Sequence, residues 1–141
     1  MILPAISIRQ PWAWAILHAG KDVENRTWVL PWKHRDVQRL IHASKRIDKE
    51  AVEHLLSLGF DVPEKLETGG IVGVTAFYVG MSAFFTRPIE SNSEWAEPHM
   101  EHWGIDTRRT EPLPFFPCSG RLGFFEVDYP YGVPEPSGCA R

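Results

Sequence analysis

The chain is poor in cysteine and in uninterrupted apolar sequence. Its two cysteines among 141 residues, Cys118 and Cys139, lie near no matching histidine pattern, so we expect neither a disulfide framework nor a zinc site. No apolar run approaches the roughly 18 residues of a membrane span, and no secretory signal peptide opens the sequence. These absences predict a soluble, cytoplasmic protein with no membrane partner, no metal and no cofactor.

The chain also lacks a strong excess of charge of either sign. A formal net charge of −3 excludes a uniformly basic nucleic-acid-binding coat. The charges are unevenly distributed, however, because residues 1–50 hold nine Lys and Arg against five Asp and Glu, whereas the remainder is acidic. A local anion-binding face on the first third of the chain is therefore compatible with the composition.

The sequence does not favour a Ser-His-Asp catalytic site or a histidine-based metal site. No nucleophile-elbow motif accompanies any serine, so Ser-His-Asp chemistry is not indicated. His99 and His102 are spaced to share one face of a helix, but no third ligand lies nearby and Pro98 precedes them. We therefore do not expect a metal site there.

What the chain does have is a compact strand, helix and turn near its start. Ile6 and Ile8 alternate with polar residues, as in a half-buried strand. A helix is predicted over 11–19, because proline suits a first helical turn and Gly20 suits the position just after a helix. Extended chain is expected over 23–28.

The rest of the pattern predicts a small α+β domain. We expect a mostly antiparallel β-barrel with flanking helices, PUA-like in shape, because several strands contain glycines that permit curvature. The domain should span 1–129 and be followed by a loosely ordered tail at 130–141. The expected elements are strands at 37–43, 71–79 and 121–129, a helix at 49–58 capped by Asp48, and a long aromatic lid or packed loop at 80–117.

The most informative polar residues follow the first helix. Glu24 and Arg26 share one face of the expected extended segment, and Lys21 must use the preceding turn to reach the same side. Lys21 would act as a general base only in its neutral form, and a neighbouring Glu24 favours the ammonium form. Two other roles remain open: a fixed positive charge for a phosphate or oxyanion, or an ion pair that braces the turn.

Aromatic and strand-end residues extend this candidate site. Trp28 or Trp103 is expected to stack on a base, while Trp12 is better explained as core. His42, Ser44 and Lys45 are expected to reach the cleft from the end of a strand, although a buried structural histidine is the commoner outcome.

Five motifs together resemble the ASCH domain, a branch of the PUA-like superfamily, over roughly residues 3–128. They are SIRQPWA at 7–13, GKxxExRxW at 20–28, IHASK at 41–45, GGIVG at 69–73 and GRLGFF at 120–125. The resemblance implies a β-barrel with a basic cleft. It also implies a role with RNA, DNA or modified nucleosides.

One ASCH branch is an amidohydrolase acting on acylated cytidine, and ribonuclease activity has been attributed to another. Lys21 and Arg26 match the Lys-x-x-Thr-x-Arg motif of the amidohydrolase branch, but Glu24 replaces its threonine. The form with Glu24 is more similar to the coactivator-type ASCH domains, for which nucleic-acid binding is the implied role.

We therefore predict a nucleic-acid or modified-nucleoside binding domain, with RNA, another single strand or a nucleoside as partner. The alternatives are an amidohydrolase of N4-acylated cytidine or a ribonuclease, with Lys21 and Glu24 as catalytic residues, and a protein-interaction module that uses 80–117. The predicted ligand-binding residues are Arg9, Gln10, Lys21, Glu24, Arg26, Trp28, His42, Ser44, Lys45 and Trp103.

Overall fold

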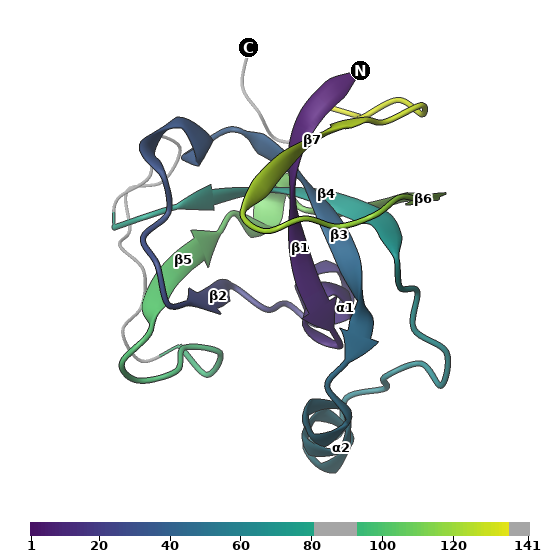
Figure 1. Ribbon diagram of the computed structural model, residues 1–141. Coiled ribbons are helices and arrows are strands. Elements are labelled where there is room, and N and C mark those ends of the chain that lie inside the picture. Colours follow the sequence, from purple (N-terminus) through teal and green to yellow (C-terminus); the bar gives the residue numbers. More distant parts are fainter. Residues whose placement is uncertain (81–92, 136–141) are drawn as a thin grey trace.

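The computed structural model describes residues 1–80 and 93–135. The helices are α1 (Trp12–His18) and α2 (Lys49–Ser57), with short 3-10 turns η1 (Trp32–His34) and η2 (Thr107–Arg109). The strands are β1 (Ile2–Gln10), β2 (Val23–Arg26), β3 (Gln38–Ile47), β4 (Gly70–Tyr78), β5 (Glu101–Ile105), β6 (Glu111–Pro117) and β7 (Phe124–Asp128). The expected small α+β domain is confirmed (Figure 1).

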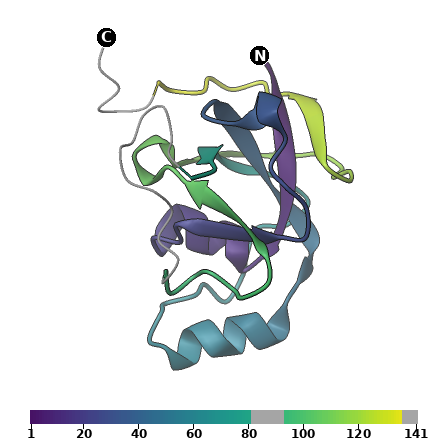
Figure 2. The same cartoon turned by 90° about the vertical axis from the view of Figure 1, so that its left-hand side faces the viewer.

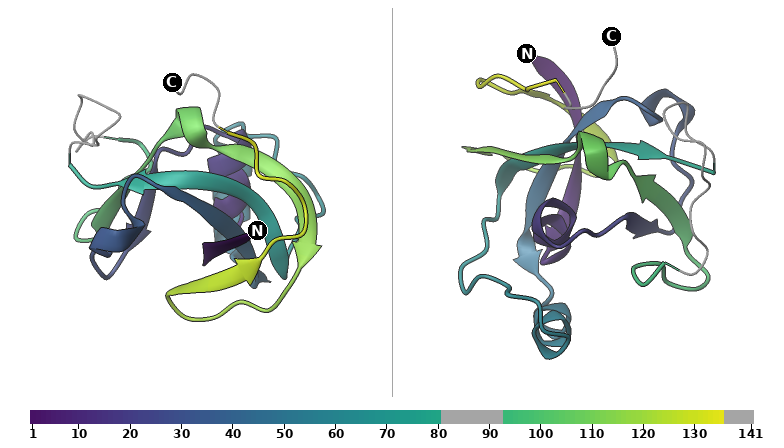
Figure 3. Two further views of the ribbon diagram at one scale, coloured as in Figure 1. Left: turned by 90° about the horizontal axis from the view of Figure 1, so that it is seen from above. Right: turned by 180° about the vertical axis from the view of Figure 1, so that it is seen from behind.

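The strands form one mixed sheet with the order β2-β5-β4-β3-β1-β7, and β6 pairs with β4. β1 and β3 run parallel, whereas the other pairings between named strands are antiparallel. The sheet is strongly curved when seen from above (Figure 3). In the described part of the chain, no pairing joins β7 to β2, so the expected closed barrel is wrong.

β4 lies at the centre of the fold, and all nine of its residues are buried. Its first half pairs with β6 and its last two residues pair with β5, while β3 lies along its other side. A mostly apolar strand rich in β-branched residues suits a position covered on both faces. The prediction of a strong strand at 71–79 is confirmed, with a start one residue earlier and an end at Tyr78.

The prediction of one long lid or packed loop over 80–117 is wrong for residues 101–117, because β5, η2 and β6 lie there. β6 contains Pro112, Pro114 and Pro117, which argued against a strand in the sequence. It pairs only with β4 among the described strands, and an edge strand tolerates proline because one side of its backbone needs no ladder hydrogen bonds. Residues 81–92 of that segment, and 136–141 of the expected tail with Cys139, lie outside the described residues.

The helices and the first turn match their sequence signals closely. Gly20 has φ +74°, a conformation suited to glycine, and the Lys21 amide bonds back to the Ala15 carbonyl at 3.1 Å. The Asp48 side chain caps α2 by accepting from the Ala51 amide at 3.0 Å. β7 begins later than expected because Gly123 is in a positive-φ turn and Leu122 is fully exposed.

α2 lies at the end of the molecule opposite the N-terminus (Figures 1 and 2). It is joined to α1 by a small apolar cluster centred on Leu55, Ala15 and Val62, against which Trp12 and Trp95 pack. This cluster is separate from the main core, where Trp103 stacks on Phe124 with centroids 5.8 Å apart. None of the described helices has the length and apolar character needed to cross a membrane.

Candidate ligand-binding site

Lys21, Glu24 and Arg26 form a continuous chain of charges. Lys21 Nζ lies 3.2 Å from Glu24 Oε1, and Arg26 Nε lies 2.9 Å from Glu24 Oε2. Glu24 and Arg26 lie on one face of β2, as the alternation predicted. Lys21 reaches the same side because the turn at Gly20 reverses the chain before β2 begins.

This chain of charges is largely removed from water. Lys21 is 2% exposed and Glu24 is 6% exposed. Lys21 Nζ also donates to the Val23 carbonyl and lies 5.7 Å from the centre of the Trp12 ring. Since Nζ donates to a carbonyl and to a carboxylate, the geometry suits an ammonium that acts as a fixed positive charge better than an amine that accepts a proton.

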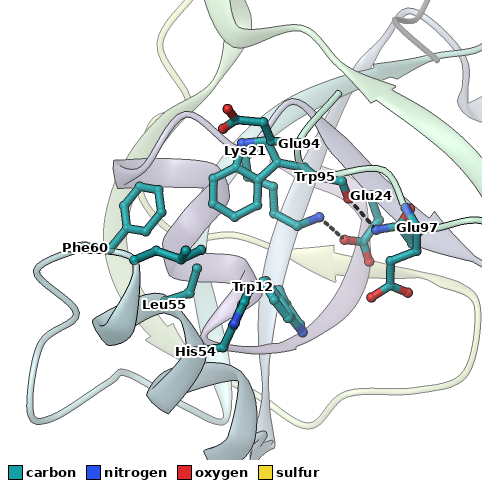
Figure 4. A pocket seen from close by; sticks show the side chains of 11 residues that line it. Trp12, Lys21, Glu24, His54, Leu55, Phe60, Glu94, Trp95 and Glu97 are labelled. Atoms are coloured by element: carbon teal, nitrogen blue, oxygen red, sulfur yellow. Dashed lines mark hydrogen bonds and ion pairs between the residues drawn. The ribbon is translucent and has the colours of Figure 1, made fainter. Parts of the chain in front are cut away.

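A pocket of about 310 Å³ opens beside Lys21 and Glu24 (Figure 4). We call it the acidic pocket; its principal lining residues are Trp12, Lys21, Glu24, Asn25, His54, Leu55, Phe60, Glu94, Trp95 and Glu97. Figure 4 shows the Lys21 and Glu24 side chains pointing toward one another, with the aromatic side chains around them. Such a volume, with apolar walls and a few convergent polar groups, is typical of a small-molecule site.

One wall of the acidic pocket is held in place by side chains of β2 and the turn before it. Asn25 donates from Nδ2 to the Trp95 carbonyl at 2.8 Å and accepts at Oδ1 from the Glu97 amide at 2.9 Å. Ser93 Oγ donates to Asp22 Oδ1 at 2.6 Å. These bonds fix the segment that carries Trp95, so the aromatic wall does not depend on apolar contacts alone.

The charge of this pocket differs from that of the cleft expected from the sequence. Among the described residues that line it, Lys21 is the only lysine or arginine, and it shares the lining with three glutamates, Glu24, Glu94 and Glu97. Glu94 and Glu97 are exposed and lie at the rim. The pocket therefore favours a neutral or cationic ligand with hydrogen-bond donors and disfavours a phosphate.

A second pocket, of about 540 Å³, is lined by Arg26, Lys45 and Arg121. We call it the basic pocket; its polar and cationic lining residues are Ser7, Arg26, His42, Ser44, Lys45, Ser119 and Arg121. None of the described residues that line it is acidic. Arg26 joins the two pockets, because it lines the basic pocket while bonding to Glu24 of the acidic one.

The residues predicted as one cleft are thus divided. Lys21 and Glu24 line the acidic pocket, and Arg26, His42, Ser44 and Lys45 line the basic pocket. The other predicted residues, Arg9, Gln10, Trp28 and Trp103, line neither of these two pockets.

Of these four, Trp103 is 1% exposed in the core, and its indole N–H donates to the Trp28 carbonyl at 3.1 Å. Gln10 is buried, where it accepts from the Trp14 amide and donates to the Glu67 carbonyl. Trp28 is half-buried against Trp103, and Arg9 is exposed on β1.

Some pocket residues were not singled out from the sequence. Asn25 lies between Glu24 and Arg26, but its importance comes from bonds to a segment 70 residues away. Trp95 lies in the segment expected to be an aromatic lid or packed loop, and nothing in the sequence indicated that it faces a ligand. Arg121 belongs to the GRLGFF motif, which was a usable signal. No family model and no curated protein matches the chain.

Proposed function

We propose that the chain binds a nucleobase, either of a modified nucleoside or of a single-stranded nucleic acid such as RNA, in the acidic pocket. One observation supports this more than any other. The half-buried rings of Trp12 and Trp95 flank a floor on which Lys21 and Glu24 are paired. Flat aromatic walls suit a planar ring, and a floor with both donor and acceptor suits its polar edge.

Glu24 retains acceptor capacity for a ligand. Among the described residues, each carboxylate oxygen accepts from one neighbour, Lys21 at Oε1 and Arg26 at Oε2, while a carboxylate offers about four lone-pair sites. An exocyclic amine of a base would be a suitable donor. The glutamates at the rim add a preference for a base that carries donors or a positive charge, as some modified bases do.

The resemblance to ASCH domains supports the same proposal, including its PUA-like character. The motifs GKxxExRxW and IHASK supply Lys21, Glu24, Arg26, His42, Ser44 and Lys45 to the two pockets. A shared ancestry with nucleic-acid-binding domains would explain why two pockets meet at this segment.

The proposal is tested by fluorescence titration with nucleosides, including cytidine, N4-acetylcytidine and adenosine, and by anisotropy with short single-stranded RNA and DNA. Trp95→Ala should weaken binding by about 5- to 150-fold, since stacking on one aromatic side chain is worth about 1–3 kcal/mol. Trp32→Ala is the matched control, because Trp32 is 83% exposed and lines neither pocket. Equal binding by both variants would contradict the proposal.

The hydrolase alternative remains a prediction. The geometry of Lys21 supports it less well than it supports ligand binding, because Nζ already donates to the Val23 carbonyl and to Glu24. Chromatography after incubation with N4-acetylcytidine or with RNA oligomers would detect turnover, and loss of turnover in Lys21→Met would support the enzyme. The protein-interaction alternative predicts a stable oligomer or complex, which light scattering would detect.

A further inference from the structure

The basic pocket has cationic side chains without partners of their own. Lys45 and Arg121 are both exposed, and within residues 1–80 and 93–135 neither forms an ion pair or a side-chain hydrogen bond. Both line the basic pocket, where no described acidic residue competes for them. Two such cations at one recess attract an anion.

Arg26 adds a third cation that is already positioned. Its Nε donates to Glu24, and its Nη2 donates to the Ser7 carbonyl at 2.9 Å. These bonds fix the guanidinium group, whose side chain is 22% exposed, and within the described part of the chain they leave Nη1 without a hydrogen-bond partner. A guanidinium held in this way loses little side-chain entropy when it binds an oxyanion.

The loop at 118–123 closes the same pocket and is itself anchored. The Cys118 amide donates to the Gly69 carbonyl at 3.1 Å, and the Cys118 carbonyl lies 2.8 Å from His42 Nε2. Because that carbonyl can only accept, Nε2 carries a hydrogen, and the other ring nitrogen, Nδ1, lies 2.9 Å from Ser7 Oγ.

The backbone of the loop lies against the His42 and Ser7 side chains at Gly120. A Cβ at Gly120 would lie 2.8 Å from His42 Cε1 and 3.0 Å from Ser7 Oγ, and His42 is 1% exposed with both ring nitrogens occupied. Only glycine therefore fits here. In the described part of the chain, the amides of Ser119, Gly120 and Arg121 donate no internal hydrogen bond.

We propose that the basic pocket is a phosphate-binding site. Arg26, Lys45 and Arg121 would supply the positive charge, and the loop amides with the Ser119 hydroxyl would supply directional donors. This inference goes beyond the proposed function, since it holds whether or not the acidic pocket takes a nucleobase.

The experiment is a titration of the ¹⁵N-labelled protein with inorganic phosphate, followed by NMR against sodium chloride at equal ionic strength. We expect the amide signals of Ser119, Gly120 and Arg121 to shift with saturation. Arg121→Gln and Lys45→Gln should each weaken phosphate binding by about fivefold or more.

The matched control for these variants is Arg46→Gln. It removes the same charge from the neighbouring exposed residue, which does not line the pocket, so binding should change by less than about twofold. Loop amides that respond equally to chloride, or three variants with equal affinity, would overturn the proposal.

Two further probes distinguish the source of the phosphate. A nucleoside 5′-monophosphate that shifts amides of both pockets, and loses affinity in Arg121→Gln while its nucleoside does not, would assign the site to a nucleotide. A dinucleoside phosphodiester with the same behaviour would assign it to a strand. If inorganic phosphate binds and neither nucleotide probe does, the basic pocket is a site for the free ion. If nucleosides fail to bind while phosphate still shifts the loop amides, the proposed base-binding role of the acidic pocket is wrong and the phosphate site stands.

Discussion

Glu24→Gln should be the most damaging charge substitution at the site. The neutral amide would leave Lys21 in a position that is 2% exposed without a counter-charge. Arg26 would keep its bond to the Ser7 carbonyl and partial contact with water, so the cost falls mainly on Lys21. Breaking a buried ion pair by removing one partner costs about 3–5 kcal/mol, and we expect a loss of about 3 kcal/mol in the free energy of unfolding.

Urea unfolding followed by far-UV circular dichroism measures this loss directly. A destabilisation of this size should lower the melting temperature by about 10 °C in a domain of this length. Glu94→Gln is the control, because it makes the same chemical change at an exposed position of the pocket rim and should alter stability by less than about 0.5 kcal/mol.

A second variant separates the ion pair from simple packing. Lys21→Met in the Glu24→Gln background should recover part of the loss, because it removes the unpaired cation that Glu24→Gln creates. The two substitutions together should then cost less than the sum of the single losses. If Glu24→Gln behaves like Glu94→Gln, or if the two losses simply add, Glu24 does not neutralise Lys21 and the account of the site is wrong.

Three further predictions concern stability elsewhere. Burial, with a contribution from the positive charge of Arg39, lowers the pKa of His34 from 6.5 to about 4, so the folded state favours the neutral imidazole. The free energy of unfolding, measured with urea, should therefore fall by up to about 3 kcal/mol as the pH drops from about 6.5 to about 4. The fall should be much smaller in His34→Gln. Gly104→Ala should cost about 1–3 kcal/mol by thermal unfolding, because a Cβ there would overlap the buried Tyr78 ring; an unchanged melting temperature would contradict this. Asp48→Ala should cost about 1 kcal/mol by removing the cap of α2, whereas Asp48→Asn should retain most of that stability.

Local signals in the sequence predicted local structure well. Alternation and proline placed β1 and α1, and the capping residue and a terminal glycine placed α2 to within a residue. The same local geometry brought Lys21, Glu24 and Arg26 together, because a turn of known type and the period of a strand determine which side chains share a face.

Pairing between distant segments could not be obtained in this way. β6 contains three prolines, which favoured an irregular segment. It nevertheless pairs with β4, because one side of an edge strand forms no ladder hydrogen bonds and proline needs no N–H there. The closed barrel was inferred from glycines in strands, but closure depends on whether the outer strands meet, and no local pattern encodes that.

The sequence by itself determined the short-range features of this protein. These are the helices α1 and α2, the buried central strand β4, and the charged cluster of Lys21, Glu24 and Arg26 after the first helix. Only the tertiary structure decided that one oxygen of Glu24 pairs with Lys21 and the other with Arg26. It also decided that Lys21 and Glu24 line an acidic, aromatic pocket while Arg26 lines a separate basic one. The physical reason is that the charge around a side chain depends on which remote segments pack against it, and here Trp95, Glu97 and Arg121 come from parts of the chain that fold back over β2 and β1.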